Sequence, residues 1–363
     1  MGSINSSAAK PLPVGSRYVI NIMNIVRSRG SKRTTKRIGR NVFDRPPKVS
    51  VVIPAFNVSE YIAETLDSAL GQRFREHEII VVNDGSTDRR ELEIAMGNRI
   101  EEIIYICQHN AGAGIARNVA IEHARGEIIA FLDGDDIWLP DFLASQYIFL
   151  QRHQYDMVYC DAVLFGLRYP YRQTFMETAP SAGEATFDAL LDLRCNVITS
   201  GTMARKQTIV DAGLFETERV RAHDFHLWLR MAKNGAKIGY QKKQLAKYRV
   251  RLDSLSGDSV SRVERERDVF ERVRGTIPLN QHEQKIVKRR LAGCEADLAV
   301  EQGKSLLLRG SYREAACAFR EANRHRKSLK LTIITWLARL APQVLLRHYR
   351  THRAADIALV PKI

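Results

Sequence analysis

The N-terminal half of the chain alternates short apolar runs with amphipathic segments, a pattern typical of α/β domains. The runs at 49–54, 78–82 and 128–132 are rich in valine, isoleucine and other apolar residues and have the length of buried strands. Between the first two, residues 59–70 follow a helical period. Because parallel strands need helical crossovers, this order predicts a mostly parallel sheet with flanking helices.

A glycine-rich segment at 109–118 follows a short alternating run at 103–107 and leads into another helical pattern. Glycines before a helix let the backbone approach a ligand closely, and the helix N-terminus favours phosphate. Arg117 is placed to clamp such a phosphate. The alternative interpretation is a tight strand-to-helix turn without a ligand.

Three carboxylates, Asp133, Asp135 and Asp136, come directly after the apolar run at 128–132. In open α/β sheets, ligands lie beyond the carboxyl ends of the strands. Oxygen ligands at alternate positions suit Mg²⁺ or Mn²⁺ with a bound diphosphate, because these metals take only one or two protein carboxylates. The alternative is an acidic turn, since Asp and Gly are common turn residues.

Asp84 ends the apolar run at 78–82 in the same way. Its carboxylate is placed to accept a hydrogen bond from a base or ribose, while Ser86 is an alternative cap for the next helix. These local signals leave both interpretations open.

Taken together, four motifs carry a family resemblance. They lie in order at 50–57, 81–88, 109–118 and 130–143. This series resembles the nucleotide-sugar half of the inverting glycosyltransferases of family 2, which have the GT-A fold. The resemblance implies an α/β domain with a Rossmann-like, mostly parallel central sheet, and it implies Mn²⁺ or Mg²⁺ and a nucleoside diphosphate sugar, with uridine favoured, as the donor.

The resemblance also assigns residues to the donor site. Asp135 is implied as the principal metal ligand, and Asp133 as a residue that shares the metal or reaches the ribose. The other implied donor-binding residues are Pro54, Ala55, Phe56 and Asp84 in the nucleoside pocket, with Asn110, Gly112 and Arg117 near the diphosphate.

The segments 196–205, 211–215 and 223–230 resemble the acceptor half of the same family. Asp224 matches the general base that takes a proton from the acceptor hydroxyl, and capping of its own helix is the alternative role. The chain departs from the family at His223, where Glu is usual, and at Arg251, where many relatives have His. The implied acceptor is a hydroxyl-bearing glycan or lipid-linked sugar.

The charge of the chain is concentrated at its ends. Residues 1–48 carry 11 basic and one acidic side chain (+10), residues 309–363 carry 12 and three (+9), and the remainder of the +15 chain is therefore −4. The five cysteines are scattered and lack the spacing of a disulfide framework or zinc site, and no apolar run reaches the roughly 18 residues of a membrane span. These features favour a cytoplasmic protein.

The C-terminal sequence predicts helices. Residues 299–322 have the spacing of one tetratricopeptide-like hairpin, and 329–350 form a basic amphipathic pattern with Trp336 that Pro342 should kink. Such a helix suits an anionic membrane surface better than nucleic acid, which is not expected as a partner. Packing of the apolar face on the domain itself is the alternative.

We therefore expect three parts: a basic arm at 1–47, a GT-A domain at 48–258 with donor half 48–143 and acceptor half 144–258, and an all-α extension at 259–363. The expected function is metal-dependent, inverting sugar transfer in surface polysaccharide or glycan assembly, at the inner face of the cell membrane. The alternatives are a sugar-nucleotide nucleotidyltransferase and a non-catalytic membrane- or nucleic-acid-binding protein. The first would need a basic glycine-rich loop after the first strand, and 54–57 offers none.

Overall fold

The computed structural model describes residues 46–166, 173–218, 222–251, 259–347 and 349. The predicted arm at 1–47, apart from its last two residues, lies outside the described residues, and so does Arg350.

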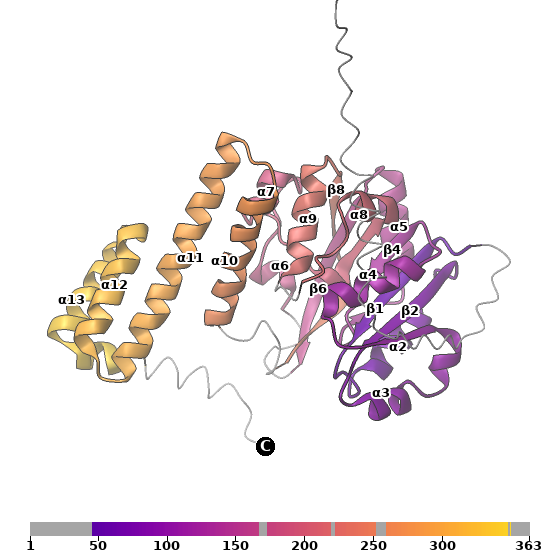
Figure 1. Ribbon diagram of the computed structural model, residues 1–363, viewed down its shortest axis with the longest axis horizontal. Coiled ribbons are helices and arrows are strands. Elements are labelled where there is room, and N and C mark those ends of the chain that lie inside the picture. Colours follow the sequence, from indigo (N-terminus) through magenta and orange to yellow (C-terminus); the bar gives the residue numbers. More distant parts are fainter. Residues whose placement is uncertain (1–45, 167–172, 219–221, 252–258, 348, 350–363) are drawn as a thin grey trace, which may run out of the picture.

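Within the described residues, eight strands form a single sheet in the order β3-β2-β1-β4-β7-β6-β8-β5 (Figure 1). β1 lies parallel to β2 and β4, and β2 lies parallel to β3, whereas β7 runs antiparallel to both β4 and β6. The strands are β1 Val49–Ala55, β2 His77–Asp84, β3 Ile104–Gln108, β4 Ile128–Phe131, β5 Ile137–Trp138, β6 Met157–Gly166, β7 Thr202–Arg205 and β8 Ile238–Val250. The predicted parallel sheet is thus confirmed for its first four strands.

Helices cover both faces of the sheet because alternate residues of each strand point to opposite sides. Val51 and Ile53 of β1 share a core with α2, α3 and α5, while Val52 packs with α4, α7 and α9. The helices of this domain are α2 Ile62–Leu70, α3 Arg89–Met96, α4 Ala113–His123, α5 Phe142–Arg152, α6 Phe175–Thr178, α7 Phe187–Leu191, α8 Lys206–Asp211 and α9 His223–Lys233, with 3-10 turns η1 Gly97–Glu102 and η2 Thr199–Gly201.

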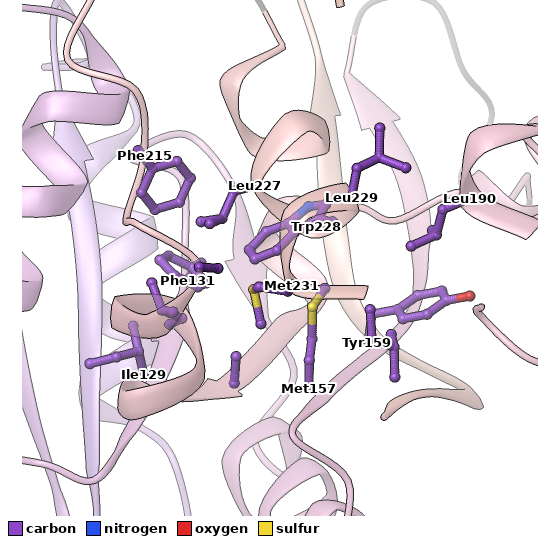
Figure 2. Packing of buried hydrophobic residues seen from close by; sticks show 14 of the residues in the cluster. Ile129, Phe131, Met157, Tyr159, Leu190, Phe215, Leu227, Trp228, Leu229 and Met231 are labelled. Atoms are coloured by element: carbon purple, nitrogen blue, oxygen red, sulfur yellow. The ribbon is translucent and has the colours of Figure 1, made fainter. Parts of the chain in front are cut away.

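An aromatic cluster fixes α9 against the middle of the sheet (Figure 2). The ring of Phe131, at the end of β4, lies 5.7 Å from the ring of Trp228 on α9 and 5.6 Å from that of Phe215. All three side chains are at most 1% exposed, and each edge-to-face pair contributes about 0.5–1.5 kcal/mol beyond its buried area. This packing holds the start of α9 near the acidic turn that follows β4.

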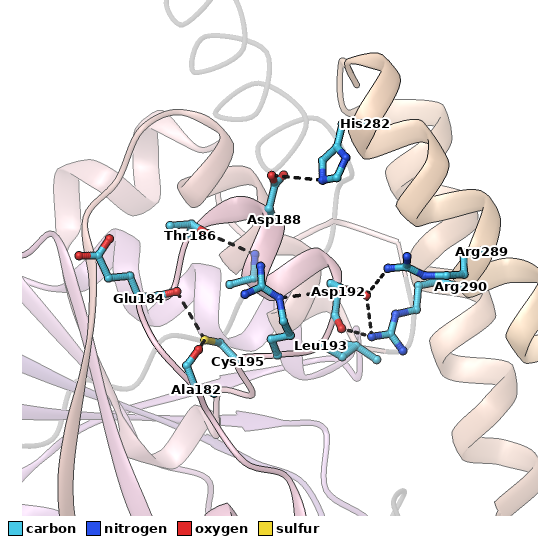
Figure 3. A network of polar contacts seen from close by, with 12 residues as sticks. Ala182, Glu184, Thr186, Asp188, Asp192, Leu193, Cys195, His282, Arg289 and Arg290 are labelled. Atoms are coloured by element: carbon cyan, nitrogen blue, oxygen red, sulfur yellow. Dashed lines mark hydrogen bonds and ion pairs between the residues drawn. The ribbon is translucent and has the colours of Figure 1, made fainter.

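The extension consists of α10 Ser259–Thr276, α11 Gln281–Leu308, α12 Tyr312–Arg326 and α13 Leu329–Leu340, which confirms the predicted all-α region. Phe270 of α10 and Ile286 of α11 belong to the same hydrophobic cluster as α9. At the junction with α7, Asp192 accepts hydrogen bonds from Arg289 (2.7 Å) and Arg290 of α11 (Figure 3). The first two helices of the extension are therefore packed on the α/β domain.

The last three helices form a separate small core. Gly303 of α11 leaves room for the ring of Phe319, since a Cβ there would lie 2.6 Å from that ring. This contact explains the small residue in the tetratricopeptide-like pattern. α13 ends at Leu340, and a further helical segment begins at Pro342, so the predicted break is confirmed. Within the described residues, no helix combines the length and the hydropathy that crossing a membrane requires.

His226 links α9 to α10 and should make stability depend on pH. Its Nε2 lies 3.1 Å from the Thr276 hydroxyl, and burial, with the charges of Arg230 and Arg272, lowers the pKa of His226 from 6.5 to about 3. A group whose pKa is lower in the folded chain makes its full contribution to stability above its pKa in the unfolded chain. That contribution is lost as pH falls. Below the pKa of this histidine in the unfolded chain, the native chain should lose up to about 1.4 kcal/mol more unfolding free energy per pH unit than His226→Gln does.

The measurement is urea unfolding of both chains at a series of pH values between neutral and mildly acidic. The variant loses the titrating group but keeps a polar side chain of similar size. A difference between the two unfolding free energies that stays constant with pH would contradict the lowered pKa.

Candidate functional site

The acidic turn after β4 is held in place by main-chain and arginine contacts. The backbone N–H of Asp133 donates to the hydroxyl of Ser200 (3.1 Å). The Asp133 carboxylate pairs with Arg117, and the Asp135 carboxylate lies 3.2 Å from Arg251. Both carboxylates keep about a quarter of their surface exposed, 29% for Asp133 and 25% for Asp135. The turn thus presents two partly open carboxylates, each beside a guanidinium group.

Asp136 has a structural part in this turn. It is 1% exposed, and it accepts hydrogen bonds from the Ser200 hydroxyl and from the backbone N–H of Arg249 (2.8 Å). Burial, together with the negative charges of Asp135 and Asp133, raises the pKa of Asp136 well above its usual value. Burial and the charge of Asp133 also raise the pKa of Asp135, which Arg251 partly offsets. The carboxylates are therefore close enough to repel one another.

Asp84 holds the loop that leads into α4. Its two carboxylate oxygens accept hydrogen bonds from the backbone N–H groups of Ala111 (2.8 Å) and Gly112 (2.7 Å), and Gln108 donates a third at 2.6 Å. Gly85 has φ +71°, and a Cβ there would lie 2.5 Å from the backbone nitrogen of Asn110. Asp84, Asn110 and Gly112, predicted from separate motifs, thus form one tightly packed unit at the N-terminus of α4.

Ser86 does not cap the helix that follows it. Its hydroxyl accepts from the backbone N–H of Asn57 at 3.2 Å, and α3 has no side-chain cap. The hydroxyl thereby ties the end of β2 to the loop after β1. At the end of β1 Ala55 is buried and Pro54 is partly exposed, and Phe56, the first residue of the loop, is 44% exposed. The exposed ring of Phe56 offers a flat apolar surface beside the carboxyl ends of β1 and β2.

Arg117 connects the acidic turn to α9. It is 4% exposed, and its guanidinium donates to the Nε2 of His223 at 2.7 Å as well as pairing with Asp133. A direct clamp on phosphate was the prediction for Arg117; in this structure its guanidinium bridges the donor-side carboxylate and the first residue of α9. His223 provides the acceptor atom for that bridge.

Asp224 lies next to this bridge, in the first turn of α9. Its carboxylate accepts from the Thr199 hydroxyl (2.6 Å) and from the N–H of Phe225 (2.8 Å). Burial would raise the pKa of Asp224, but His223, Thr199 and Arg117 together outweigh burial and lower it. The residue is therefore ionised at neutral pH and able to accept a proton. The N-cap of α9 is Ala222 and no side-chain cap bond is made there, so Asp224 does not cap the helix, although its negative charge in the first turn favours the helix N-terminus.

The two open carboxylates fit a divalent cation that keeps other ligands. No group of three or more His, Cys, Asp or Glu side chains in the described parts of the chain has the geometry to hold a metal alone. Mg²⁺ and Mn²⁺ do not need such a group, because one or two carboxylates and the oxygens of a bound diphosphate suffice. Burial and the charge of Asp133 together raise the pKa of Asp135, and a bound cation would favour its ionised form.

Residues 50–207 match the family model for glycosyl transferase family 2. The putative teichuronic acid biosynthesis glycosyltransferase TuaG of Bacillus subtilis is 30% identical over 215 residues, which cover 58% of this chain and 82% of TuaG. The chain belongs to glycosyl transferase family 2. This result confirms the predicted family and decides against the nucleotidyltransferase and non-catalytic alternatives.

Two further glycosyltransferases are similar to this chain, one in sequence and one in structure. The UDP-Glc:alpha-D-GlcNAc-diphosphoundecaprenol beta-1,3-glucosyltransferase WfaP of Escherichia coli is 29% identical over 62% of this chain and 86% of its own. The mannosyltransferase PcManGT of Pyrobaculum calidifontis, solved with GDP-Man and Mn²⁺, superposes with a TM-score of 0.55 at 21% identity, over 94% of this chain and 92% of that one. The likeness to solved glycosyltransferase structures confirms the predicted fold.

Three residues of the site went unassigned at the level of sequence. Thr199 and Ser200, adjacent on η2, bond to Asp224 and to the acidic turn respectively, and Arg249 binds the carbonyl of Asp135 through its Nε at 2.7 Å. The segment 196–205 resembles the acceptor half, but two neighbouring hydroxyl residues in a sequence do not indicate which side chains they will contact. The contacts depend on the antiparallel strand β7, which the pattern did not predict.

Proposed function

We propose that this glycosyltransferase is metal-dependent and inverting, and that it transfers a sugar from a nucleoside diphosphate sugar to a hydroxyl acceptor. The observation that carries the proposal is the contact series from Asp133 through Arg117 to His223, which links a carboxylate of the donor half to the residue next to Asp224. In the proposal the domain at 48–258 performs catalysis and the extension from 259 supports it.

Inversion at the anomeric carbon needs a base on the acceptor side and stabilisation of the leaving group on the other. Asp224 accepts the proton of the attacking hydroxyl, and Thr199 orients its carboxylate. Asp135 and Asp133 would hold the divalent metal, which supplies positive charge to the departing diphosphate. Arg251 adds a further positive charge next to Asp135.

In this proposal the donor base stacks on Phe56 in the pocket formed with Pro54, Ala55 and Asp84, and the diphosphate lies at the start of α4, near Asn110 and Gly112. Helix N-termini favour phosphate, which supports that placement. Uridine is the favoured base, which is also the base of UDP-Glc, the donor in the name of WfaP. PcManGT was solved with GDP-Man, so relatives of this fold use more than one base.

The proposed acceptor is a growing glycan or a lipid-linked sugar in surface polysaccharide assembly. The names of TuaG and WfaP, which refer to teichuronic acid and to a diphosphoundecaprenol, support this class. We place the reaction at the cytoplasmic face of the membrane, with the basic C-terminal helices as the contact. The exposure of Trp336 on α13, 58%, supports such a contact.

Calorimetric titration of UDP, GDP, CDP and dTDP, each with Mn²⁺ and with a chelator, tests the donor part of the proposal. UDP should bind most tightly, and the chelator should weaken its binding because the diphosphate then lies beside two carboxylates with no metal ion between them. Equal binding with and without metal would contradict the metal-dependent part, and binding of none of the four would contradict the donor class.

Arg251 should compete with the metal for Asp135. Its guanidinium lies 3.2 Å from an oxygen that a metal would need, so Arg251→Gln should bind Mn²⁺ more tightly in the absence of donor. The reason is that one charged competitor for the carboxylate is removed. Direct Mn²⁺ titration of both chains measures this, with Arg73→Gln, whose partner Asp141 belongs to an exposed ion pair, as the control. Weaker Mn²⁺ binding by Arg251→Gln would show that Arg251 instead organises the site.

A further inference from the structure

The C-terminal helices enclose a basic pocket far along the chain from the catalytic residues. Between α12 and α13 lies a pocket of about 330 Å³ whose lining includes Arg320, Arg324, Arg339 and Trp336. Two further lining residues bond to each other, since Asn323 of α12 donates a hydrogen bond to the Thr332 hydroxyl of α13 at 2.8 Å. The lining of this pocket therefore carries three arginines, and a hydrogen bond between two of its lining residues joins the two helices.

The positive charge of this pocket is largely uncompensated. Residues 311–347 carry eight Lys and Arg against two acidic side chains, 8 − 2 = +6. Arg324 pairs with Glu321 in an exposed ion pair one helical turn away. For Arg320 and Arg339, no carboxylate in the described residues lies within ion-pair distance. Phosphate is a ligand that the planar, always charged guanidinium groups of arginines bind well.

An apolar stripe runs beside the pocket along the outer face of α13 and the helical segment after it. It consists of Leu329 (84% exposed), Ile333 (59%), Trp336 (58%), Leu340 (71%) and Val344 (59%). The spacing of three or four residues puts the first four of them on one face of α13, and Val344 follows beyond the break. Trp336 belongs to both features, since its ring lines the pocket and lies in the stripe.

The stripe is distinct from the face of α13 that packs on the protein. Ala338 and, beyond the break, Leu345 and Leu346 are buried against Phe319 and Leu307 of the small C-terminal core. The helix therefore has two apolar faces: an inner one that stabilises the extension, and an outer one that no described residue covers. Of the two roles predicted for this segment, packing on the protein applies to the inner face, and surface binding remains open for the outer face.

We propose that the pocket binds the phosphate headgroup of an anionic membrane phospholipid while the stripe enters the acyl boundary of the bilayer. The inference rests on the proposed function at the membrane face and names the site and the ligand. Charge complementarity selects an anionic lipid, and Trp with aliphatic residues on one face beside arginines is the composition of interfacial helices. In Figure 1, α12 and α13 lie at the end of the molecule away from the sheet, so membrane contact leaves the catalytic face open.

The test uses the full chain and vesicle sedimentation. The pocket variant is Arg320→Gln with Arg339→Gln, the stripe variant is Trp336→Ser with Leu340→Ser, and the matched control is Arg75→Gln with Arg152→Gln, two exposed arginines of the α/β domain. Substitutions are preferable to removal of α13, because removal would uncover Phe319 and Leu307. Circular dichroism verifies that all variants fold.

The native chain should sediment with phosphatidylglycerol vesicles and not with phosphatidylcholine vesicles. The pocket variant should partition about 30-fold more weakly, since each arginine at an anionic surface contributes roughly 1 kcal/mol and 1.4 kcal/mol corresponds to tenfold. The stripe variant should lose the part of binding that persists in high salt, because salt screens charge but not apolar insertion. The control should change binding by less than about threefold, because its arginines lie outside the pocket.

Other outcomes overturn the proposal. If the pocket variant and the control lose vesicle binding equally, the binding depends on net charge and not on the pocket. Binding only to phosphatidylcholine vesicles doped with a polyisoprenyl phosphate would assign the pocket to a lipid-linked acceptor. A stripe variant that changes oligomeric state but not vesicle binding would make the stripe a contact between copies.

Release of nucleoside diphosphate with a soluble acceptor, measured on every variant, separates this inference from the proposed function. Unchanged release with no vesicle binding refutes the lipid site alone, whereas absence of release from the native chain refutes the function.

Discussion

Asp224→Asn should reduce sugar transfer by about 10²- to 10⁴-fold while leaving donor binding nearly unchanged. The amide keeps the size of the carboxylate and can still accept a hydrogen bond from Thr199, but it cannot take the proton of the acceptor hydroxyl. Because burial is outweighed by His223, Thr199 and Arg117, the native carboxylate is ionised at neutral pH and available as a base.

The measurement is initial rate and donor affinity for the native chain, for Asp224→Asn and for Asp211→Asn. Asp211 is an exposed residue of α8 that bonds to Gln207 and lies outside the site, so it controls for the substitution itself. If donor affinity falls together with the rate in Asp224→Asn, Asp224 belongs to the donor site or to the fold and is not the base.

Asp135→Ala should lower transfer by at least about 10³-fold and weaken donor binding too. Removing this carboxylate leaves Asp133 to hold the metal, and loss of metal stabilisation of a leaving diphosphate costs several kcal/mol. The expected pattern therefore differs from that of Asp224→Asn, where only the rate falls. Steady-state kinetics with a Mn²⁺ titration separates the two patterns.

Asp141→Ala is a suitable control, because Asp141 is a nearby exposed carboxylate whose partner is Arg73. It should keep native kinetics. Native activity of Asp135→Ala in the presence of a chelator would refute metal dependence and would transfer the neutralising role to Arg251 and Arg117.

The sequence predicted the part of the fold that local patterns encode. The strands β1 to β4 are short apolar runs, and the predicted donor residues other than Arg117 lie at or soon after their carboxyl ends. Asp84, Gly112 and Asp133 therefore come together because parallel strands end at the same edge of a sheet. The helical extension was also predictable, because the spacing of its apolar residues indicates helices and Pro342 indicates the break.

The second half of the site depends on contacts that no local pattern reveals. β7 inserts antiparallel between β4 and β6, and this brings Thr199 and Ser200 beside Asp224 and Asp133. Arg117 was predicted to contact phosphate because it follows a glycine-rich turn, yet its partners in the structure, Asp133 and His223, come from 16 and 106 residues away along the chain. Similarly, α13 reads as a single amphipathic helix, but packing divides its apolar residues between an inner and an outer face.

The central claim is tested most directly by incubating the chain with a panel of nucleotide sugars, Mn²⁺ and a soluble hydroxyl acceptor, and measuring the release of nucleoside diphosphate. The account predicts that one donor, a UDP-sugar, is consumed, that release requires the acceptor and the metal, and that Asp224→Asn suppresses it. Failure of every donor and acceptor pair, or formation of pyrophosphate from a nucleoside triphosphate and a sugar phosphate instead, would contradict it.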